Sequence, residues 1–197
     1  MKAMAMILVT FVLVGCTDKS GSKTGDSSGS KTGNKSTASV EPVPAKRKAA
    51  IAAIGQLGGE VTVDEKKPGK PVIAVSFNNT KVTDTELAHL KGLISLQNLN
   101  LQDTKVTDAG LIHLVGLTNL EDLNLSGTNV GDAGLVHLKG LTKIQKLDLN
   151  GTKITNAGLV HLNGLIELQS LDVTDTKVTA AGVKTPKAAL PKCQIVR

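Results

Sequence analysis

The residues with the clearest capacity for chemistry are four histidines that recur every 24 residues. They are His89, His113, His137 and His161, and the chain has no others. Imidazole binds zinc where three or four ligands converge on one point. At this period the histidines instead form a line, one in each of four stacked units about 4.8 Å apart. We therefore predict no metal site, and we expect these side chains to pack at a helix edge.

Covalent and phosphate chemistry is no better supported. Cys16 and Cys193 are the only cysteines, and neither a Cys-His pair nor a Ser-His-acid set converges in a stack of this kind. Residues 25–32 read GDSSGSKT, where Ser30 replaces the second glycine of a phosphate-binding loop. No strand is expected before this segment and no helix after it. The sequence thus predicts a protein that is not an enzyme, without cofactor or small-molecule substrate.

Cys16 carries the most specific chemical signal. Lys2 precedes an apolar run that ends Leu13-Val14-Gly15-Cys16, which resembles the signal and lipobox of bacterial lipoproteins. The resemblance implies that residues 1–15 are removed and that the thiol receives a diacylglycerol; an uncut signal is the alternative. The apolar run is too short to span a bilayer. Thr17, rather than an acid, follows the cysteine, which favours the outer over the inner membrane. We expect a lipid-anchored cell-envelope protein with its domain outside the cytoplasm.

Residues 16–44 comprise the lipidated cysteine and a tether rich in Ser, Gly, Thr and Lys without apolar periodicity. Such a segment cannot bury enough surface to offset the entropy of ordering, so we expect it to be disordered. Its root-mean-square reach would be about 30 Å. It would hold the folded part clear of the lipid headgroups.

The charge distribution argues against nucleic-acid binding. The formal net charge is +6, yet residues 50–197 contain 15 basic and 14 acidic residues, so the excess lies in the signal and tether. The chain also has no Trp and no Tyr for base stacking. The basic tether suits anionic lipid or a cell-wall polymer instead.

A 24-residue repeat dominates the remaining sequence. It occurs four times over residues 82–177, and a period of this length predicts a solenoid of units that are stable only when stacked. Leu99 and Leu101 on either side of Asn100 show the period-two pattern of a strand with one buried face. Thr83 and Glu86 form a capping-box pair that predicts a helix start. Glycines are expected to end the helices, at Gly92, Gly116, Gly140 and Gly164.

These units resemble the leucine-rich-repeat family, whose pattern is L-x-x-L-x-L-x-x-N. The matching positions begin with Leu96, Leu99 and Leu101 and recur three more times without an insertion. The family asparagine is replaced throughout by threonine, at Thr80, Thr104, Thr128, Thr152 and Thr176. Its hydroxyl is expected to pair with the backbone of the tight turn and of the adjacent rung. The resemblance implies an α/β leucine-rich-repeat solenoid, with a parallel sheet on one face and short helices on the other.

The flanking segments are predicted to cap the stack. Residues 45–81 would form an N-terminal cap and first rung, with a helix over 45–57 and strands over 61–63 and 72–77. Residues 178–197 would form the C-terminal cap, in which Pro186 and Pro191 break the helix and residues 192–197 add a last strand. Cys193 is expected to be a buried small apolar residue.

The resemblance implies protein binding through the outward side chains of the sheet. These candidates are Asn98, Asn100, Gln102, Asp122, Asn124, Ser126, Lys146, Asp148, Asn150, Ser170, Asp172 and Thr174. Asp148 and Asp172 are a like-charged pair on adjacent rungs, able to meet a cation or a basic side chain. Large aromatic side chains, which favour tight binding, are absent from this set.

A further column of lysines is expected at one edge: Lys81, Lys105, Lys153 and Lys177. Acids or an amide follow three residues later, at Asp84, Asp108, Asp132 and Asn156, and local pairing should neutralise the edge. The leading prediction is a membrane-tethered protein-protein interaction module with an unidentified partner. The alternative is a structural or spacer lipoprotein of the envelope without a specific ligand.

Overall fold

The computed structural model describes residues 44–197. The predicted signal peptide, Cys16 and the tether up to residue 43 lie outside the described residues. Strands in the described part are β1 (Glu60–Val63), β2 (Val72–Ser76), β3 (Asn98–Asn100), β4 (Asp122–Asn124), β5 (Lys146–Asp148), β6 (Ser170–Asp172) and β7 (Gln194–Val196). Helices, with η for 3-10, are α1 (Pro44–Gln56), η1 (Glu86–Leu90), η2 (Gly110–Leu114), α2 (Asp132–Leu135), η3 (Val136–Leu138), η4 (Gly158–Leu162) and α3 (Lys184–Ala189). None of these helices has the length and apolar character needed to cross a bilayer.

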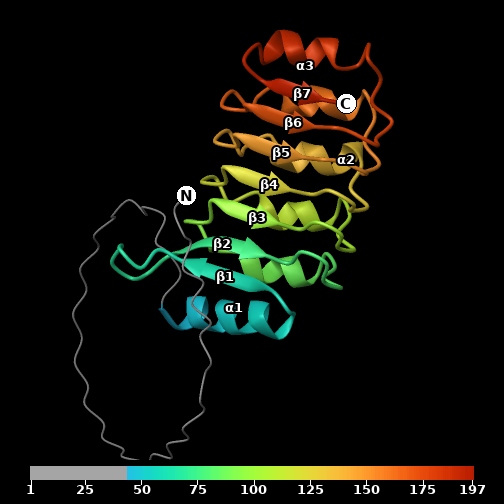
Figure 1. The fold of residues 1–197 in the computed structure, drawn as a ribbon. Helices are drawn as coiled ribbons and strands as arrows, with labels where there is room; N and C mark the ends of the chain where they lie inside the picture. The colour runs from blue at the N-terminus through green and yellow to red at the C-terminus, as the bar shows by residue number, and fades with distance from the viewer. Residues whose placement is uncertain (1–43) are drawn as a thin grey trace, which may run out of the picture. The chain divides into compact units, whose positions relative to one another are not determined.

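The seven strands form one sheet in chain order (Figure 1). β1 and β2 form an antiparallel hairpin, and each later strand pairs in parallel with the one before it. The register shifts by one 24-residue repeat at every step, so that Leu99, Leu123 and Leu147 lie directly beside one another. The sequence repeat is therefore also the repeat of the solenoid, and one 24-residue unit is called a rung below.

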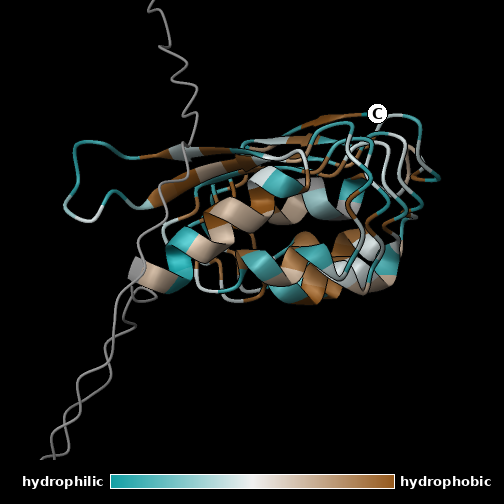
Figure 2. Ribbon diagram, turned by 90° about the horizontal axis from the view of Figure 1, so that it is seen from below, coloured by the Kyte–Doolittle hydropathy of each residue, from teal (hydrophilic) through white to brown (hydrophobic). Residues whose placement is uncertain are grey.

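The core lies between the sheet and the helices, which cover one face of the sheet (Figure 2). Leu99 and Leu101 of the strand segment and Leu111, Leu114 and Leu117 of the helical return are all buried. This confirms the predicted strand and helix periodicities, since both place one leucine set of each rung in the same interior. The fold is an α/β leucine-rich-repeat solenoid.

Each strand leads into a tight turn that needs a left-handed residue. Asn79, Asp103, Gly127, Gly151 and Asp175 occupy this position, with φ between 54° and 68°. Glycine, Asn and Asp tolerate this region better than other residues. The threonine that follows donates its hydroxyl to the carbonyl three residues earlier, as Thr128 does to Leu125 at 2.6 Å. The hydroxyls at Thr80, Thr104, Thr152 and Thr176 make the same bond within their own rung, without the predicted bond to the adjacent rung.

The helical returns begin later than predicted and are mostly 3-10. Glu86 Oε2 accepts from the Thr83 backbone N–H at 2.8 Å and from the Thr83 hydroxyl at 2.6 Å, which is half of a capping box. These bonds, the side-chain one above all, lower the pKa of Glu86 to about 2. Of the four glycines expected to end the helices, Gly92 has a positive φ and Gly116, Gly140 and Gly164 do not. Helix ends therefore depend little on left-handed glycine here.

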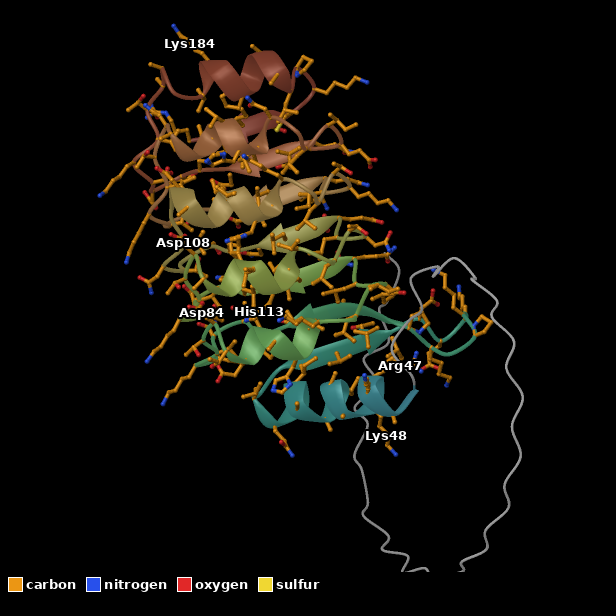
Figure 3. All side chains as sticks on the ribbon, turned by 180° about the vertical axis from the view of Figure 1, so that it is seen from behind. Arg47, Lys48, Asp84, Asp108, His113 and Lys184 are labelled. Carbon is orange, nitrogen blue, oxygen red and sulfur yellow. The ribbon has the colours of Figure 1, made fainter. Side chains whose placement is uncertain are left out.

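A side-chain bridge connects each rung to the next, and we call it the cross-rung clamp. Asp84 accepts from the backbone N–H of Thr107 at 2.7 Å and from its hydroxyl at 2.6 Å. Asp132 makes the same pair of bonds with Thr155, and Asp108 accepts from the N–H of Gly131 at 2.6 Å. Asn156 replaces the acid in the last clamp and bonds Thr179. Asp84 and Asp108 lie one rung apart along the same edge of the stack (Figure 3).

Both ends of the stack are capped. α1 packs against β1 and η1, and its Ile54 is fully buried, which confirms the predicted helix at this end. At the other end β7 confirms the predicted last strand, and Cys193 is fully buried as expected. The prediction that Pro186 breaks the helix is wrong. Pro186 lies in the first turn of α3, where its missing N–H removes no intrahelical bond, and α3 ends before Pro191.

Candidate binding groove on the sheet

The outer surface of the sheet, opposite the helices, forms one open groove with a volume of about 470 Å³. It crosses every strand from β1 to β6. Its floor is made by the strand leucines, among them Leu99, Leu123 and Leu147, each about 2% exposed. Polar side chains stand on both sides of this floor.

Parallel register sorts these polar side chains into two columns. The first column runs through Asn98, Asp122, Lys146 and Ser170, and the second through Asn100, Asn124, Asp148 and Asp172. All eight residues line the groove. All eight were predicted from the sequence, because alternate positions of a strand point to the same face.

Side chains of the second column are held by the backbone. In each rung the Oδ1 atom accepts the N–H of the residue two positions later, at distances of 2.8–2.9 Å. Because this oxygen is the acceptor, the amide nitrogens of Asn100 and Asn124 remain available to a ligand. In Asp148 and Asp172 the second carboxylate oxygen, Oδ2, remains available to a ligand. The second column thus offers hydrogen-bond donors on two rungs and anionic acceptors on the next two.

The groove is acidic. Four carboxylates line it, on Glu60, Asp122, Asp148 and Asp172, against the single ammonium of Lys146, which gives a net charge of −3. Lys146 lies beside Asp122 in the first column, with Nζ 3.6 Å from Oδ2. The two side chains are 69% and 41% exposed, so solvent screens the pair and it adds little to stability. Asp148 and Asp172 face each other in direct register without such a partner in the described part.

The remaining predicted face residues are not part of the groove. Gln102, Asn150 and Thr174 lie beyond the strand ends, where their N–H groups are the ones bound by the second column. Ser126 is more buried than its counterparts Gln102, Asn150 and Thr174 in the other rungs. Ser126 is 8% exposed, and its hydroxyl donates to Asn124 Oδ1 at 2.8 Å. Its low exposure follows from this bond, which holds the hydroxyl against the neighbouring side chain.

Sequence reasoning missed the N-terminal end of the groove. Glu60 and Thr62 of β1, together with Ala74 and Ser76 of β2, also line it. The signal for β2 was present, since Val75 stands 24 residues before Leu99 and its neighbours must share the outward face. β1 lies outside the repeat and pairs in the opposite direction, so the period could not place Glu60.

The four histidines lie on the other side of the stack, in the helical returns. His113 lies beside the helices in Figure 3, and its Nδ1 is buried without a hydrogen-bond partner. Within residues 44–197 no three His, Cys, Asp or Glu side chains come together as metal ligands. The histidines lie one in each return, in η1, η2, η3 and η4.

The lysine edge differs from its prediction. Asp84, Asp108 and Asp132 bond the next rung through the cross-rung clamp instead of pairing with lysines. Ion pairs in the described part join Asp64 to Lys67, Glu65 to Lys70 and Asp122 to Lys146. The physical reason is that a backbone N–H one rung away is fixed in place, whereas an exposed lysine must lose side-chain entropy to pair. The expected ion pairs are therefore not formed in the described part, although the three carboxylates still place their negative charge on the same edge as the lysines.

Comparison with known proteins agrees with the repeat. Residues 92–115, 116–138 and 140–162 match the family model described as Leucine Rich repeat. No curated protein matches the chain.

Three solved structures illustrate the similarity. An LRR protein of Leptospira interrogans is 24% identical, with a TM-score of 0.45, over 56% of this chain and 27% of its own. Internalin C2 of Listeria monocytogenes is 21% identical, with a TM-score of 0.38, over 78% of this chain and 82% of its own. A second Listeria internalin, inlF, is 18% identical, with a TM-score of 0.43, over 75% and 54%. The chain thus spans about a quarter of the Leptospira protein.

Proposed function

We propose that this leucine-rich-repeat domain binds a protein partner in the groove on its sheet. The observation that carries the proposal is the second column. Four side chains there are fixed by backbone bonds, while one polar atom of each stays available. Groups fixed before binding lose little entropy when a ligand arrives, which is the condition for specific recognition.

The chemistry of the groove supports a partner with two kinds of group. Asn100 and Asn124 offer amide donors, which suit carbonyl oxygens of a polypeptide. Asp148 and Asp172 offer paired carboxylates, which suit a lysine or arginine side chain. A segment with free carbonyls at one part and a basic side chain about two rungs further along satisfies both. No aromatic side chain lines the groove, so the affinity should be modest.

The same lack of aromatic residues favours a second candidate, a spacer without a specific ligand. The two functions differ in whether contacts are confined to the groove. In the spacer, neighbouring proteins would touch the helical side as often as the sheet. A position-resolved experiment therefore separates them.

For the test, a photocrosslinking amino acid is placed in the full chain at Asn98 or Ser170 of the first column, or at Ile112 or Val160, which are exposed on η2 and η4. After irradiation in cells that express the protein natively, we expect one common adduct from the two groove positions and none from the other two. Asp148→Asn with Asp172→Asn keeps the Oδ1 acceptors and should reduce this adduct. Equal adducts at all four positions would favour the spacer.

We further propose that a diacylglycerol on Cys16 holds the domain at the cell envelope, on the outer membrane. The lipobox pattern and the short apolar run before it support this anchor. Radiolabelled palmitate should enter the wild-type chain and not Cys16→Ser. Label that persists in Cys16→Ser would reject the anchor, and membrane fractionation of the labelled protein tests the choice of membrane.

A further inference from the structure

A basic surface lies at the N-terminal end of the stack, which α1 closes (Figure 1). It consists of the first turns of α1 and the loop between β1 and β2, and we call it the basic cap. Its cations are Lys46, Arg47, Lys48, Lys66, Lys67 and Lys70. The first three precede the nearly neutral range 50–197 and belong to α1 rather than to the tether. α1 itself contains no acid.

The helix and the loop form one surface. A Cβ atom added to Gly69 would lie 3.7 Å from Nη1 of Arg47, so this guanidinium reaches the turn of the loop. Figure 3 shows Arg47 at the end of α1, beside the loop. The backbone N–H of Lys70 donates to Lys67 O at 3.0 Å, which closes the turn. Residues 65–70 are all exposed, so the loop presents its lysines to solvent from a defined turn.

A full count of charges leaves this end basic. Residues 44–77 contain six basic and three acidic residues, a net charge of +3. Asp64 and Glu65 lie in the loop and pair with Lys67 and Lys70, and both acids are counted with their charge. The third acid, Glu60, lies at the opposite end of β1 and lines the groove. Residues 78–197 contain twelve basic and eleven acidic residues, so most of the net charge of the described part lies in the basic cap.

The chain enters the domain at this same surface. α1 begins at residue 44, 28 residues after Cys16, and a flexible segment of that length has a root-mean-square reach of about 30 Å. Residues 17–43 carry four lysines and three acids, so they do not offset the charge of the cap. With the lipid anchor proposed above, on which this step rests, the basic cap is the part of the domain that is joined most closely to the headgroups.

We propose that the basic cap docks the N-terminal end of the domain on an anionic phospholipid surface. On the exposed side of α1 the lysines alternate with small residues, Ala45, Ala49 and Ala52, which do not hold the ammonium groups away from a plane. Within residues 44–77 no large apolar side chain is exposed. The contact is therefore electrostatic, reversible and sensitive to salt.

Docking by the cap orients the domain. β7 lies at the opposite end of the stack, away from the lipid (Figure 1). The groove has a net charge of −3, so an anionic surface repels the sheet face and attracts the cap. An end-on orientation therefore leaves most of the groove open to a partner.

The test is co-sedimentation of the full chain with vesicles of phosphatidylcholine alone or with about 30% phosphatidylglycerol. All proteins carry Cys16→Ser, so that acylation plays no part. Binding to neutral vesicles measures the apolar N-terminal run, and the ratio of the two partition coefficients measures the attraction to anionic lipid. Each lysine at such a surface contributes a factor of about five, so Gln at Lys46, Lys48 and Lys66 should lower the ratio about tenfold or more.

The matched control has Gln at three exposed lysines far from the cap, Lys153, Lys184 and Lys192, which changes the net charge equally. Lys184 marks the opposite end of the stack in Figure 3. This control should keep the wild-type ratio. Arginine at the three cap positions should also keep it, whereas a variant that merely misfolds would not. Raising the salt from about 0.05 to 0.5 M should remove the difference between wild type and the cap variant.

A second measurement tests the orientation. Ala52 on α1 and Ala188 on α3 are exposed, and each can be replaced by Cys and labelled with a fluorophore, because Cys193 is fully buried. Lipids with a nitroxide on the headgroup should quench the label at position 52 and leave the label at position 188 unchanged. Equal quenching at the two positions would overturn end-on docking.

Equal losses from the cap and control variants would also overturn the proposal, as would binding that does not depend on phosphatidylglycerol. If soluble polyphosphate binds the chain and vesicles do not, the cap binds a soluble polyanion and the lipid proposal is wrong. The anchor is judged separately by palmitate labelling. A cap-dependent ratio without palmitate label would reject the anchor and support docking, and label without a cap-dependent ratio would do the reverse.

Discussion

The carboxylate of Asp84 bonds both the backbone N–H and the hydroxyl of Thr107, which lies 23 residues later. One side chain thereby satisfies two groups of the next rung. The same geometry recurs at Asp132 with Thr155. Neighbouring rungs are therefore joined by buried leucines in the interior and, at the edge, by a charge-assisted clamp beside backbone bonds such as Lys105 N to Val82 O.

Removing the clamp should destabilise the domain. Asp84→Ala leaves the Thr107 N–H without its acceptor and should lower the free energy of unfolding by about 1–3 kcal/mol. Asp84→Asn should cost much less, since Asn156 serves as the clamp residue in the last junction. Urea denaturation of the two variants measures both effects. Identical midpoints for Asp84→Ala and wild type would show that the clamp does not contribute.

Gly134 lies against the cross-rung clamp, where there is little room for a larger side chain. A Cβ on Gly134 would stand 2.6 Å from Asp108 Oδ1 and 3.1 Å from the Asp108 Cα atom. We expect Gly134→Ala to cost about 1–3 kcal/mol through this overlap. Gly140→Ala is the matched control, because nothing lies within 4 Å of its Cβ and its φ is not positive. It should be neutral or stabilise by up to about 1 kcal/mol. Thermal unfolding of both variants provides the comparison.

Thr128 tests the threonine column. Its hydroxyl is buried and donates to Leu125 O at 2.6 Å. Thr128→Val keeps the shape and leaves that carbonyl short of one donor, which should cost about 1–3 kcal/mol. Thr118→Val, at an exposed position, is the control. An unchanged melting temperature for Thr128→Val would refute the structural role of this column.

Acid should weaken the start of the first helical return. The folded pKa of Glu86 is lowered to about 2, so its contribution is present above the unfolded value near 4.5 and is lost as pH falls toward 2. Glu86→Gln lacks this titration. The melting temperatures of wild type and Glu86→Gln should therefore differ most above pH 5 and converge as pH falls to about 2. A constant difference across that range would contradict the assignment.

The second column of the groove should contribute to stability, and the first column should not. Asn124→Ala removes the acceptor for the N–H and hydroxyl of Ser126 and should cost about 1–3 kcal/mol. Asn98→Ala, at an exposed position of the first column, should leave stability unchanged. The melting temperatures of these two single variants test the distinction. Loss of stability in Asn98→Ala would show that the first column also holds the fold.

The strands, the core and the groove columns could be predicted because they follow the 24-residue repeat. Translation by 24 residues places Leu99 on Leu123 and Asn100 on Asn124, so strand, core and groove columns follow from alternation alone. The turn residues were harder. Asp103 and Gly127 occupy the same left-handed position, although their side chains share no chemistry beyond tolerance of positive φ.

The clamp could not be recognised by local patterns. Asp84 stands one residue after a threonine at a predicted helix start, where an acid already has an adequate explanation in the helix dipole. Its true partner lies in the next rung, and only the stacked geometry brings Thr107 within reach. The expected ion pairs between the lysines and these acids were wrong for the same reason, because the acids bond groups of the next rung instead. The burial of Ser126 was also not predicted, because its bond to Asn124 forms in the turn that follows β4.

The order of the second column also gives the groove a direction. Amides come first along the stack, at Asn100 and Asn124, and carboxylates follow, at Asp148 and Asp172. A polypeptide laid in the reverse sense would set its basic side chain against amide hydrogens and its carbonyls against carboxylates. The proposed recognition would therefore depend on direction, and a partner with the same residues in the opposite chain order should bind less well.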